Sequence, residues 1–252
     1  MMRRILSFIF LILVGVVSSQ IAERPNPQRL YNNLSKEFPE FLNAQQSMQL
    51  EEKLEQFSNQ TSNQICVVIV DEFNGTDAAD YATKIINEWG IGKKGSNNGI
   101  VILVKPTGGA NGRDLFIGIG YGLEGAIPDL ATKRIREEEM YPYLKAGDNY
   151  TAIDKATDKL MALAKGEINV EDYSRQSNNK NNTTALVIII VVIVLLLRIF
   201  FGGGGGRTFS SGGSTTFWGG GGFGSGFSGG GSGGFGGFGG GSSGGGGSGG
   251  SW

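Results

Sequence analysis

Two glycine-rich stretches of this sequence carry the side chains that are best suited to bind a metal ion. They lie at residues 95–99 and 120–125, and with the residues that follow they supply four oxygen donors: Asn97, Asn98, Glu124 and Asp129. Carboxylate and amide oxygens without histidine or cysteine are the ligands that Ca²⁺ and Mg²⁺ prefer. The sequence predicts a divalent-cation site at these residues. The alternative is that the glycines only form tight turns and that Asp129 only stabilises the start of a helix.

The composition removes several kinds of chemistry. The chain has no histidine, which excludes a Ser-His-Asp triad, a Cys-His dyad and histidine-ligated zinc. Its one cysteine, Cys66, cannot form an intramolecular disulfide and lies in the apolar run Ile65–Val70. We interpret Cys66 as a buried core residue rather than a nucleophile. No catalytic residue can be assigned, and neither zinc nor haem is expected.

A glycine motif at Gly120, Gly122 and Gly125 has the spacing of a dinucleotide-binding fingerprint. In such a fingerprint a strand returns after the helix, and an acidic residue follows about twenty residues on. Here no strand is expected to return, and Lys145 stands at the later position. The sequence therefore does not favour a nucleotide as a ligand.

Hydrophobic periodicity predicts the elements that position these loops. Apolar runs typical of buried strands lie at residues 64–70, 99–104 and 114–119. Helices are expected at residues 43–57, from 76 or 77 to 89, at 128–141 and at 150–164. This order indicates an α/β fold, with a small mixed β-sheet and helices packed on its faces.

The expected topology brings the two glycine-rich stretches together. A helix joins the first two strands, so these should be parallel, whereas the second and third strands are close enough in sequence for an antiparallel hairpin. The end of the third strand should then lie beside the start of the second. Asp71, which follows the first strand, belongs at the opposite edge of the sheet.

The ends of the chain indicate export and membrane attachment. Residues 1–19 read as a signal peptide, because Arg3 and Arg4 precede an apolar stretch and small residues follow it. The folded domain is expected at 23–170, followed by a polar linker at 171–184. Residues 185–201 are apolar apart from Arg198 and predict one transmembrane helix of about 25 Å. Residues 202–252 hold 29 of the 44 glycines and predict a disordered Gly/Ser/Phe-rich tail.

This arrangement predicts a single-pass membrane protein whose folded domain is extracytoplasmic (periplasmic in a Gram-negative bacterium) and whose tail is cytoplasmic. Residues 23–180 carry 18 basic and 23 acidic side chains, a formal charge of −5. A negative domain disfavours nucleic acid as a partner. The expected partners are the lipid bilayer and other membrane or extracytoplasmic proteins.

Three stretches together resemble the TPM domain family over residues 24–166. They are residues 87–104 (NEWGIGKKGSNNGIVILV), residues 119–129 (IGYGLEGAIPD) and residues 141–148 (YPYLKAGD). The resemblance implies an α/β/α sandwich and, in some members, divalent-cation binding and an acid-phosphatase activity. This chain departs from the family pattern, since Asn97 replaces an aspartate and Asn33 follows Asn32 where the family has Asn-Asp. The loss of these carboxylates weakens any cation site.

The leading hypothesis is a non-catalytic, membrane-tethered binding or scaffolding module that acts outside the cytoplasm, in membrane-protein assembly or turnover. The alternative is a divalent-metal-dependent acid phosphatase that uses the loop at residues 120–129. A third hypothesis assigns the spaced aromatic residues of the tail a role in clustering the protein.

Overall fold

The computed structural model describes residues 21–109, 112–173, 191 and 235–252. The predicted signal peptide at 1–19 and nearly all of the apolar segment at 185–201 therefore lie outside the described residues. In the part of the chain that is described, no helix is both long enough and apolar enough to cross a membrane. Residues 235–252 belong to the same compact unit as the domain.

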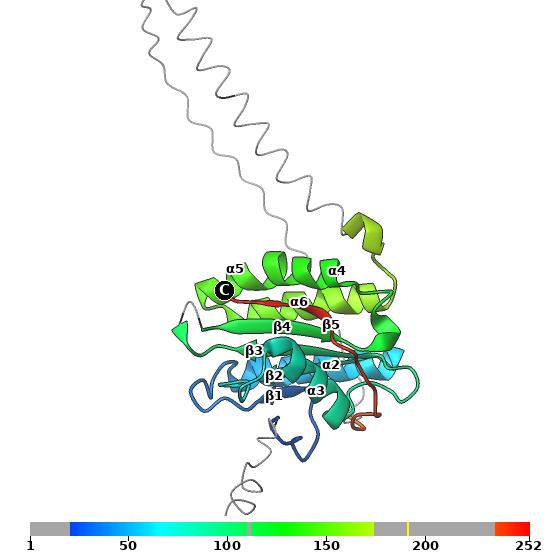
Figure 1. Cartoon of the computed structure of the whole chain (residues 1–252), viewed down its shortest axis with the longest axis horizontal. Coiled ribbons are helices and arrows are strands. Elements are labelled where there is room, and N and C mark those ends of the chain that lie inside the picture. Colours follow the sequence, from blue (N-terminus) through cyan, green and yellow to red (C-terminus); the bar gives the residue numbers. More distant parts are fainter. Residues whose placement is uncertain (1–20, 110–111, 174–190, 192–234) are drawn as a thin grey trace, which may run out of the picture. The chain divides into compact units, whose positions relative to one another are not determined.

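Five strands form one mixed sheet in the order β1-β2-β3-β4-β5 (Figure 1). Their bounds are Tyr31–Asn33, Gln64–Ile69, Gly99–Lys105, Asp114–Ile119 and Gly246–Gly250. The first three strands are parallel, with Gln64 of β2 paired with Gly99 of β3. Strand β4 runs antiparallel to β3, and β5 runs antiparallel to β4. The predicted directions of β2, β3 and β4 are confirmed.

The central strands are apolar on both faces because helices cover both sides of the sheet. In β2, Ile65, Val67 and Ile69 point into one core, while Cys66 and Val68 point into another. This alternation follows from the two-residue period of a strand. Continuous apolar runs are the pattern expected for strands buried on two faces.

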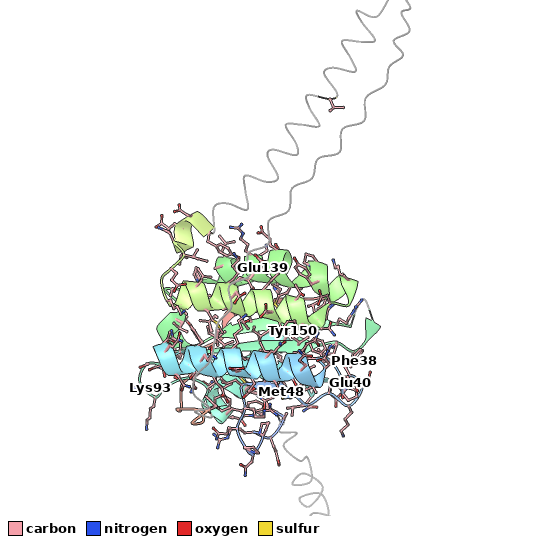
Figure 2. All side chains as sticks on the ribbon, turned by 180° about the vertical axis from the view of Figure 1, so that it is seen from behind. Phe38, Glu40, Met48, Lys93, Glu139 and Tyr150 are labelled. Carbon is pink, nitrogen blue, oxygen red and sulfur yellow. The ribbon has the colours of Figure 1, made fainter. Side chains whose placement is uncertain are left out.

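Helices α2 (Ala44–Thr61) and α6 (Asn149–Ala164) lie side by side on one face (Figure 2). Lys53 of α2 joins them through ion pairs to Asp154 (2.6 Å) and Asp158 (2.7 Å). The same core includes residues of α4 (Asp129–Arg134), the π-helix η3 (Ile135–Met140) and α5 (Tyr141–Ala146). Helix α3 (Ala78–Trp89) covers the opposite face, so the sheet is sandwiched between helices.

Side-chain caps explain where the longer helices begin. Asn43 and Gln46 form a reciprocal capping box at the start of α2. Asp77 caps α3 by accepting a hydrogen bond from the Asp80 amide, and Asp148 caps α6 by accepting one from the Thr151 amide. These positions agree with the predicted helix starts to within one or two residues.

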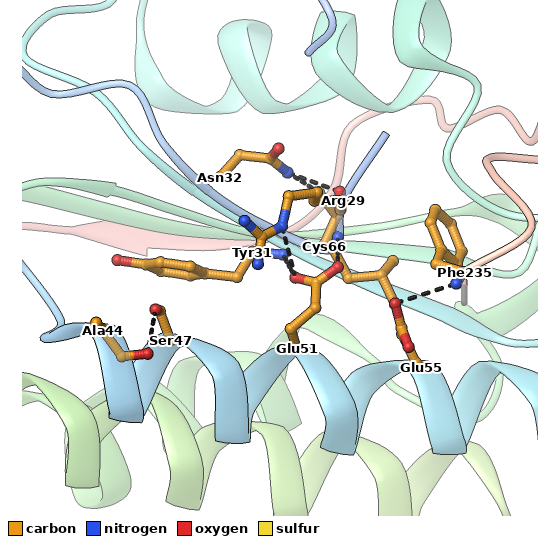
Figure 3. A network of polar contacts seen from close by, with 10 residues as sticks. Arg29, Tyr31, Asn32, Ala44, Ser47, Glu51, Glu55, Cys66 and Phe235 are labelled. Carbon is orange, nitrogen blue, oxygen red and sulfur yellow. Dashed lines mark hydrogen bonds and ion pairs between the residues drawn. The ribbon is translucent and has the colours of Figure 1, made fainter. Parts of the chain in front are cut away.

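Strand β1 is held by a side chain of the helix that follows it. The carboxylate of Glu51 in α2 accepts hydrogen bonds from the Leu30 amide (2.8 Å) and the Tyr31 amide (2.7 Å) (Figure 3). Burial raises the pKa of Glu51, against the lowering effect of these two bonds and of nearby Arg29. This three-residue strand was not among the predicted elements.

The largest difference from the sequence-based expectation is at residues 235–252, hereafter the docked segment. The whole of 202–252 was predicted to be disordered, but the docked segment lies on the domain and adds β5 to the sheet. Residues 202–234 lie outside the described residues. Composition predicted disorder because glycines bury no side chains, and the structure shows that these glycines pack through their backbones instead.

Candidate functional site

The two glycine-rich loops meet as the topology predicts. The Gly120 amide donates to the Gly99 carbonyl at 2.8 Å, and the Gly122 amide donates to the Asn97 carbonyl at 3.0 Å. Both glycines are required by this contact. A Cβ atom on Gly122 would lie 1.8 Å from the Ser96 carbonyl oxygen, and one on Gly120 would lie 2.3 Å from that of Asn97. Gly120 and Gly122 of the fingerprint-like motif therefore serve loop packing.

Asn98 is a structural residue at the base of these loops. Its side chain is 7% exposed, and its Oδ1 accepts a hydrogen bond from the Lys93 amide at 2.8 Å. Its Nδ2 donates to the Ser62 carbonyl (2.8 Å) and to Asn63 Oδ1 (2.9 Å). These bonds join the start of β3 to the end of α2, so both polar atoms of the Asn98 side-chain amide are used in loop packing.

The other three predicted donors all face the docked segment. Asn97 Oδ1 accepts from Ser242 Oγ at 3.0 Å, and Asp129 Oδ1 accepts from the Gly247 amide at 2.8 Å. Glu124 lies against Gly246, where a Cβ atom would be 2.9 Å from its Oε1. The structure thus brings Asn97, Glu124 and Asp129 to one edge of the sheet, where a peptide strand contacts them.

A metal at this edge stays a prediction. Among the described residues, no three acidic or cysteine side chains gather closely enough to hold a metal ion. Asn98 is committed to loop packing, and the Oδ1 atoms of Asn97 and Asp129 bind the docked segment. Asn98 therefore serves the loops in this structure, while Asn97, Glu124 and Asp129 stay the predicted oxygen donors of a cation that would also take ligands from water or backbone carbonyls.

Sequence reasoning missed several residues that contact the docked segment, among them Asn87 and Gln64. The side chain of Asn87 binds both backbone polar groups of Ser243. Asn87 Oδ1 accepts from the Ser243 amide (2.8 Å), and Asn87 Nδ2 donates to the Ser243 carbonyl (3.2 Å). Gln64 donates to the Gly237 carbonyl at 3.1 Å and accepts from the Gly92 amide at 2.6 Å. Nothing in the local pattern identifies either residue, because their partner is a distant segment.

Asp71 lies at the opposite edge, as predicted. It follows β2 at the end where Ile69 pairs with Val104. Its carboxylate accepts hydrogen bonds from Ser35 Oγ, the Lys36 amide (2.7 Å) and the Glu37 amide (3.4 Å). Slight burial alone would raise the pKa of Asp71, but these three bonds outweigh it and lower the pKa. Asp71 therefore has a structural role, because it fixes the connection at residues 35–37 to the end of β2.

Cys66 is a core residue, as predicted. It is fully buried in β2, and Asn32 Nδ2 lies 3.4 Å from its Sγ. Burial raises the pKa of the Cys66 thiol, so the thiol stays protonated and unreactive.

The comparison with family models identifies the domain. The model described as the TPM domain matches residues 36–163, half of the chain. The chain belongs to the TPM domain family. The matched range of the TPM domain includes both glycine loops and ends before the docked segment.

Two solved structures are similar to this TPM domain. One is the solution NMR structure of the N-terminal domain of a P. gingivalis protein, with 20% identity and a TM-score of 0.46. That match covers 55% of this chain and 83% of the other. The second is the N-terminal domain of a Corynebacterium glutamicum protein, with 13% identity, a TM-score of 0.41 and coverage of 62% and 93%. No curated protein matches the chain.

Proposed function

We propose that this TPM domain is a non-catalytic binding module, tethered to a membrane through the apolar segment at 185–201 and acting outside the cytoplasm. One observation carries the proposal. The edge of β4 and the two glycine loops hold an extended peptide by backbone pairing and by the side chains of Asn87, Asn97 and Asp129. Addition of a strand to a sheet edge is a recurring way in which domains recognise polypeptides.

The proposed role follows from this mode of recognition. A module that binds extended chain segments outside the cytoplasm suits the assembly or turnover of membrane proteins, whose loops and termini are exposed there. The domain's excess of acidic over basic residues argues against nucleic acid as the partner.

A divalent-metal-dependent acid phosphatase is the second candidate. The matching family model is labelled a TPM phosphatase, and Glu124 and Asp129 face adjacent residues of β5, Gly246 and Gly247. One or two carboxylates are the usual protein ligands of Mg²⁺ at sites that act on phosphates, where the cation would polarise a phosphoryl oxygen.

Phosphate release separates the two candidates. The full chain in detergent is assayed at acidic and neutral pH with a chromogenic phosphomonoester, with and without millimolar Ca²⁺ or Mg²⁺. The Glu124→Ala and Asp129→Asn variants serve as comparisons. We expect no metal-dependent release above the level of either variant. Turnover that requires the metal and disappears in Glu124→Ala would establish the phosphatase and reject the non-catalytic module.

A further inference from the structure

Aromatic residues anchor the docked segment at both ends. Phe238 stacks on Trp89 of α3 with ring centroids 6.4 Å apart, and Phe235 packs edge-on against Phe238 at 5.1 Å. At the other end, Trp252 stacks on Tyr141 at 6.4 Å and is only 7% exposed. Large aromatic side chains in pockets are the usual anchors of a binding interface.

Between these anchors, close backbone contacts require glycine. A Cβ atom on Gly241 would lie 2.2 Å from the Ile91 carbonyl oxygen, and one on Gly247 would lie 1.9 Å from that of Ile117. At Gly236, by contrast, a Cβ atom would meet nothing within 4 Å. The surface that receives the docked segment, formed by β4 and the loops at 90–99 and 120–124 (hereafter the acceptor surface), therefore distinguishes glycine from alanine at particular positions.

Serines take the positions where the acceptor surface offers a polar partner. Ser243 Oγ donates to the Ile119 carbonyl at 2.5 Å, while its backbone is held at both polar groups by Asn87. Ser248 Oγ lies 3.0 Å from Thr132 Oγ1. Buried hydroxyl groups need such partners, so the order of glycine and serine matches the surface.

Backbone pairing joins these contacts into one continuous site. Gly246 to Gly250 pair with Ile119 to Leu115, that is, with all of β4 except Asp114. Earlier in the segment, the Gly240 amide donates to the Gly90 carbonyl at 2.6 Å, and Gly239 accepts from the Lys94 amide at 2.8 Å. At one end of the docked segment, Glu55 of α2 accepts a hydrogen bond from the Phe235 amide at 3.1 Å (Figure 3). At the other end, Trp252 stacks on Tyr141. The contacts therefore cover the docked segment from its first residue to its last.

We propose that the β4 edge and the loops at 90–99 and 120–124 form a binding site for a glycine-rich strand flanked by aromatic residues, and that residues 235–252 are its tethered ligand. This proposal deepens the proposed function, on which it rests, by naming the ligand class. Binding depends on the sequence of the docked segment and not only on its covalent attachment to the domain. The site therefore also binds the same segment when it is added as a separate peptide.

The experiment uses the full chain in detergent and follows amide hydrogen exchange of β4 by mass spectrometry. In Gly241→Ala the new methyl group collides with backbone, so we expect the docked segment to detach and the β4 amides to exchange at least about tenfold faster. Gly236→Ala is the matched control, since the same substitution meets open space there. It should exchange like the unaltered protein, and β2 and β3 should stay protected in both variants.

A peptide of residues 235–252 is then added to the Gly241→Ala protein at up to about 1 mM, the effective concentration of a short tether. We expect it to restore slow exchange in β4, whereas a peptide that itself carries Gly241→Ala does not. Trp252→Ala in the chain, compared with Trp218→Ala, tests the anchor independently and should also speed exchange in β4.

Three results would overturn the proposal: unchanged β4 exchange in both Gly241→Ala and Trp252→Ala, no rescue by the peptide, or equal rescue by both peptides. The phosphate-release assay on the same samples is independent of these outcomes. Metal-dependent turnover would reject the non-catalytic module while leaving the peptide result intact.

Discussion

At the scale of single residues, the contacts that an added Cβ atom would make show which glycines of this TPM domain are required by packing. Gly122 stands against the Ser96 carbonyl oxygen, whereas a Cβ atom on Gly125 would meet nothing within 4 Å. Both belong to the same fingerprint-like motif, yet only one is required by packing. A dinucleotide site would need both, so the pair discriminates between the two interpretations.

Gly122→Ala should lower the free energy of unfolding by about 1–3 kcal/mol, because the added methyl group overpacks a backbone contact. Gly125→Ala should change it by less than about 0.5 kcal/mol. Urea unfolding of both variants, followed by tyrosine and tryptophan fluorescence, measures the difference. Equal destabilisation by the two substitutions would contradict the assignment of Gly122 to loop packing.

At the scale of elements, short connections are held by carboxylates that accept backbone hydrogen bonds. Glu51 of α2 holds β1, and Asp71 after β2 holds the connection at residues 35–37. Thr107 Oγ1 adds a bond to the Asp71 carbonyl at 2.5 Å, which joins the end of β3 to the same place. The parallel edge of the sheet is therefore assembled by long-range contacts rather than by strand propensity.

Asp71→Asn should lower the free energy of unfolding at neutral pH by about 1 kcal/mol. Hydrogen bonds to a charged group contribute more than this when buried, but Asp71 is partly exposed and solvent weakens its bonds. The pKa of Asp71 is lowered in the folded state, so its contribution is present above its unfolded pKa of about 3.9. It is lost as the pH falls through the folded pKa. The difference between the two proteins should therefore shrink between about pH 4 and pH 2.

Thermal unfolding of both proteins across this pH range checks the expectation. The neighbouring exposed residue Glu72 supplies the control, and Glu72→Gln should show a small difference at every pH. A difference for Asp71→Asn that is independent of pH would show that the ionised carboxylate is not the stabilising form.

At the scale of the whole molecule, the docked segment constrains membrane topology. Residues 235–252 can contact the domain only from the domain's side of a membrane. A single crossing at 185–201 would place them on the other side. The sequence of residues 202–234 is rich in glycine and serine and holds no apolar stretch of about 20 residues, the length that a return crossing by a helix would need. Docking and a cytoplasmic tail are thus mutually exclusive in one molecule.

We expect the docked segment to share the domain's side, so that the apolar segment at 185–201 attaches the domain to the membrane without carrying residues 235–252 across it. Ser251 is exposed and Cys66 is buried, so Ser251→Cys supplies one accessible thiol. Intact cells are treated with a membrane-impermeant maleimide, and Gln60→Cys on the exposed end of α2 serves as the domain control. Both variants should be labelled to the same extent. Labelling of Ser251→Cys only after the membrane is permeabilised would support the single crossing and a cytoplasmic tail.

The sequence by itself determined the three central strands, their directions, the main helices and the meeting of the two glycine loops. These features follow from side-chain periodicity and from caps, which are local signals. Only the tertiary structure decided β1 and β5. Strand β1 depends on a carboxylate that lies twenty residues later, and Gly246–Gly250 has no hydrophobic pattern at all. It becomes a strand because β4 presents an edge for backbone pairing, and because at Gly247 the Ile117 carbonyl leaves no room for a side chain.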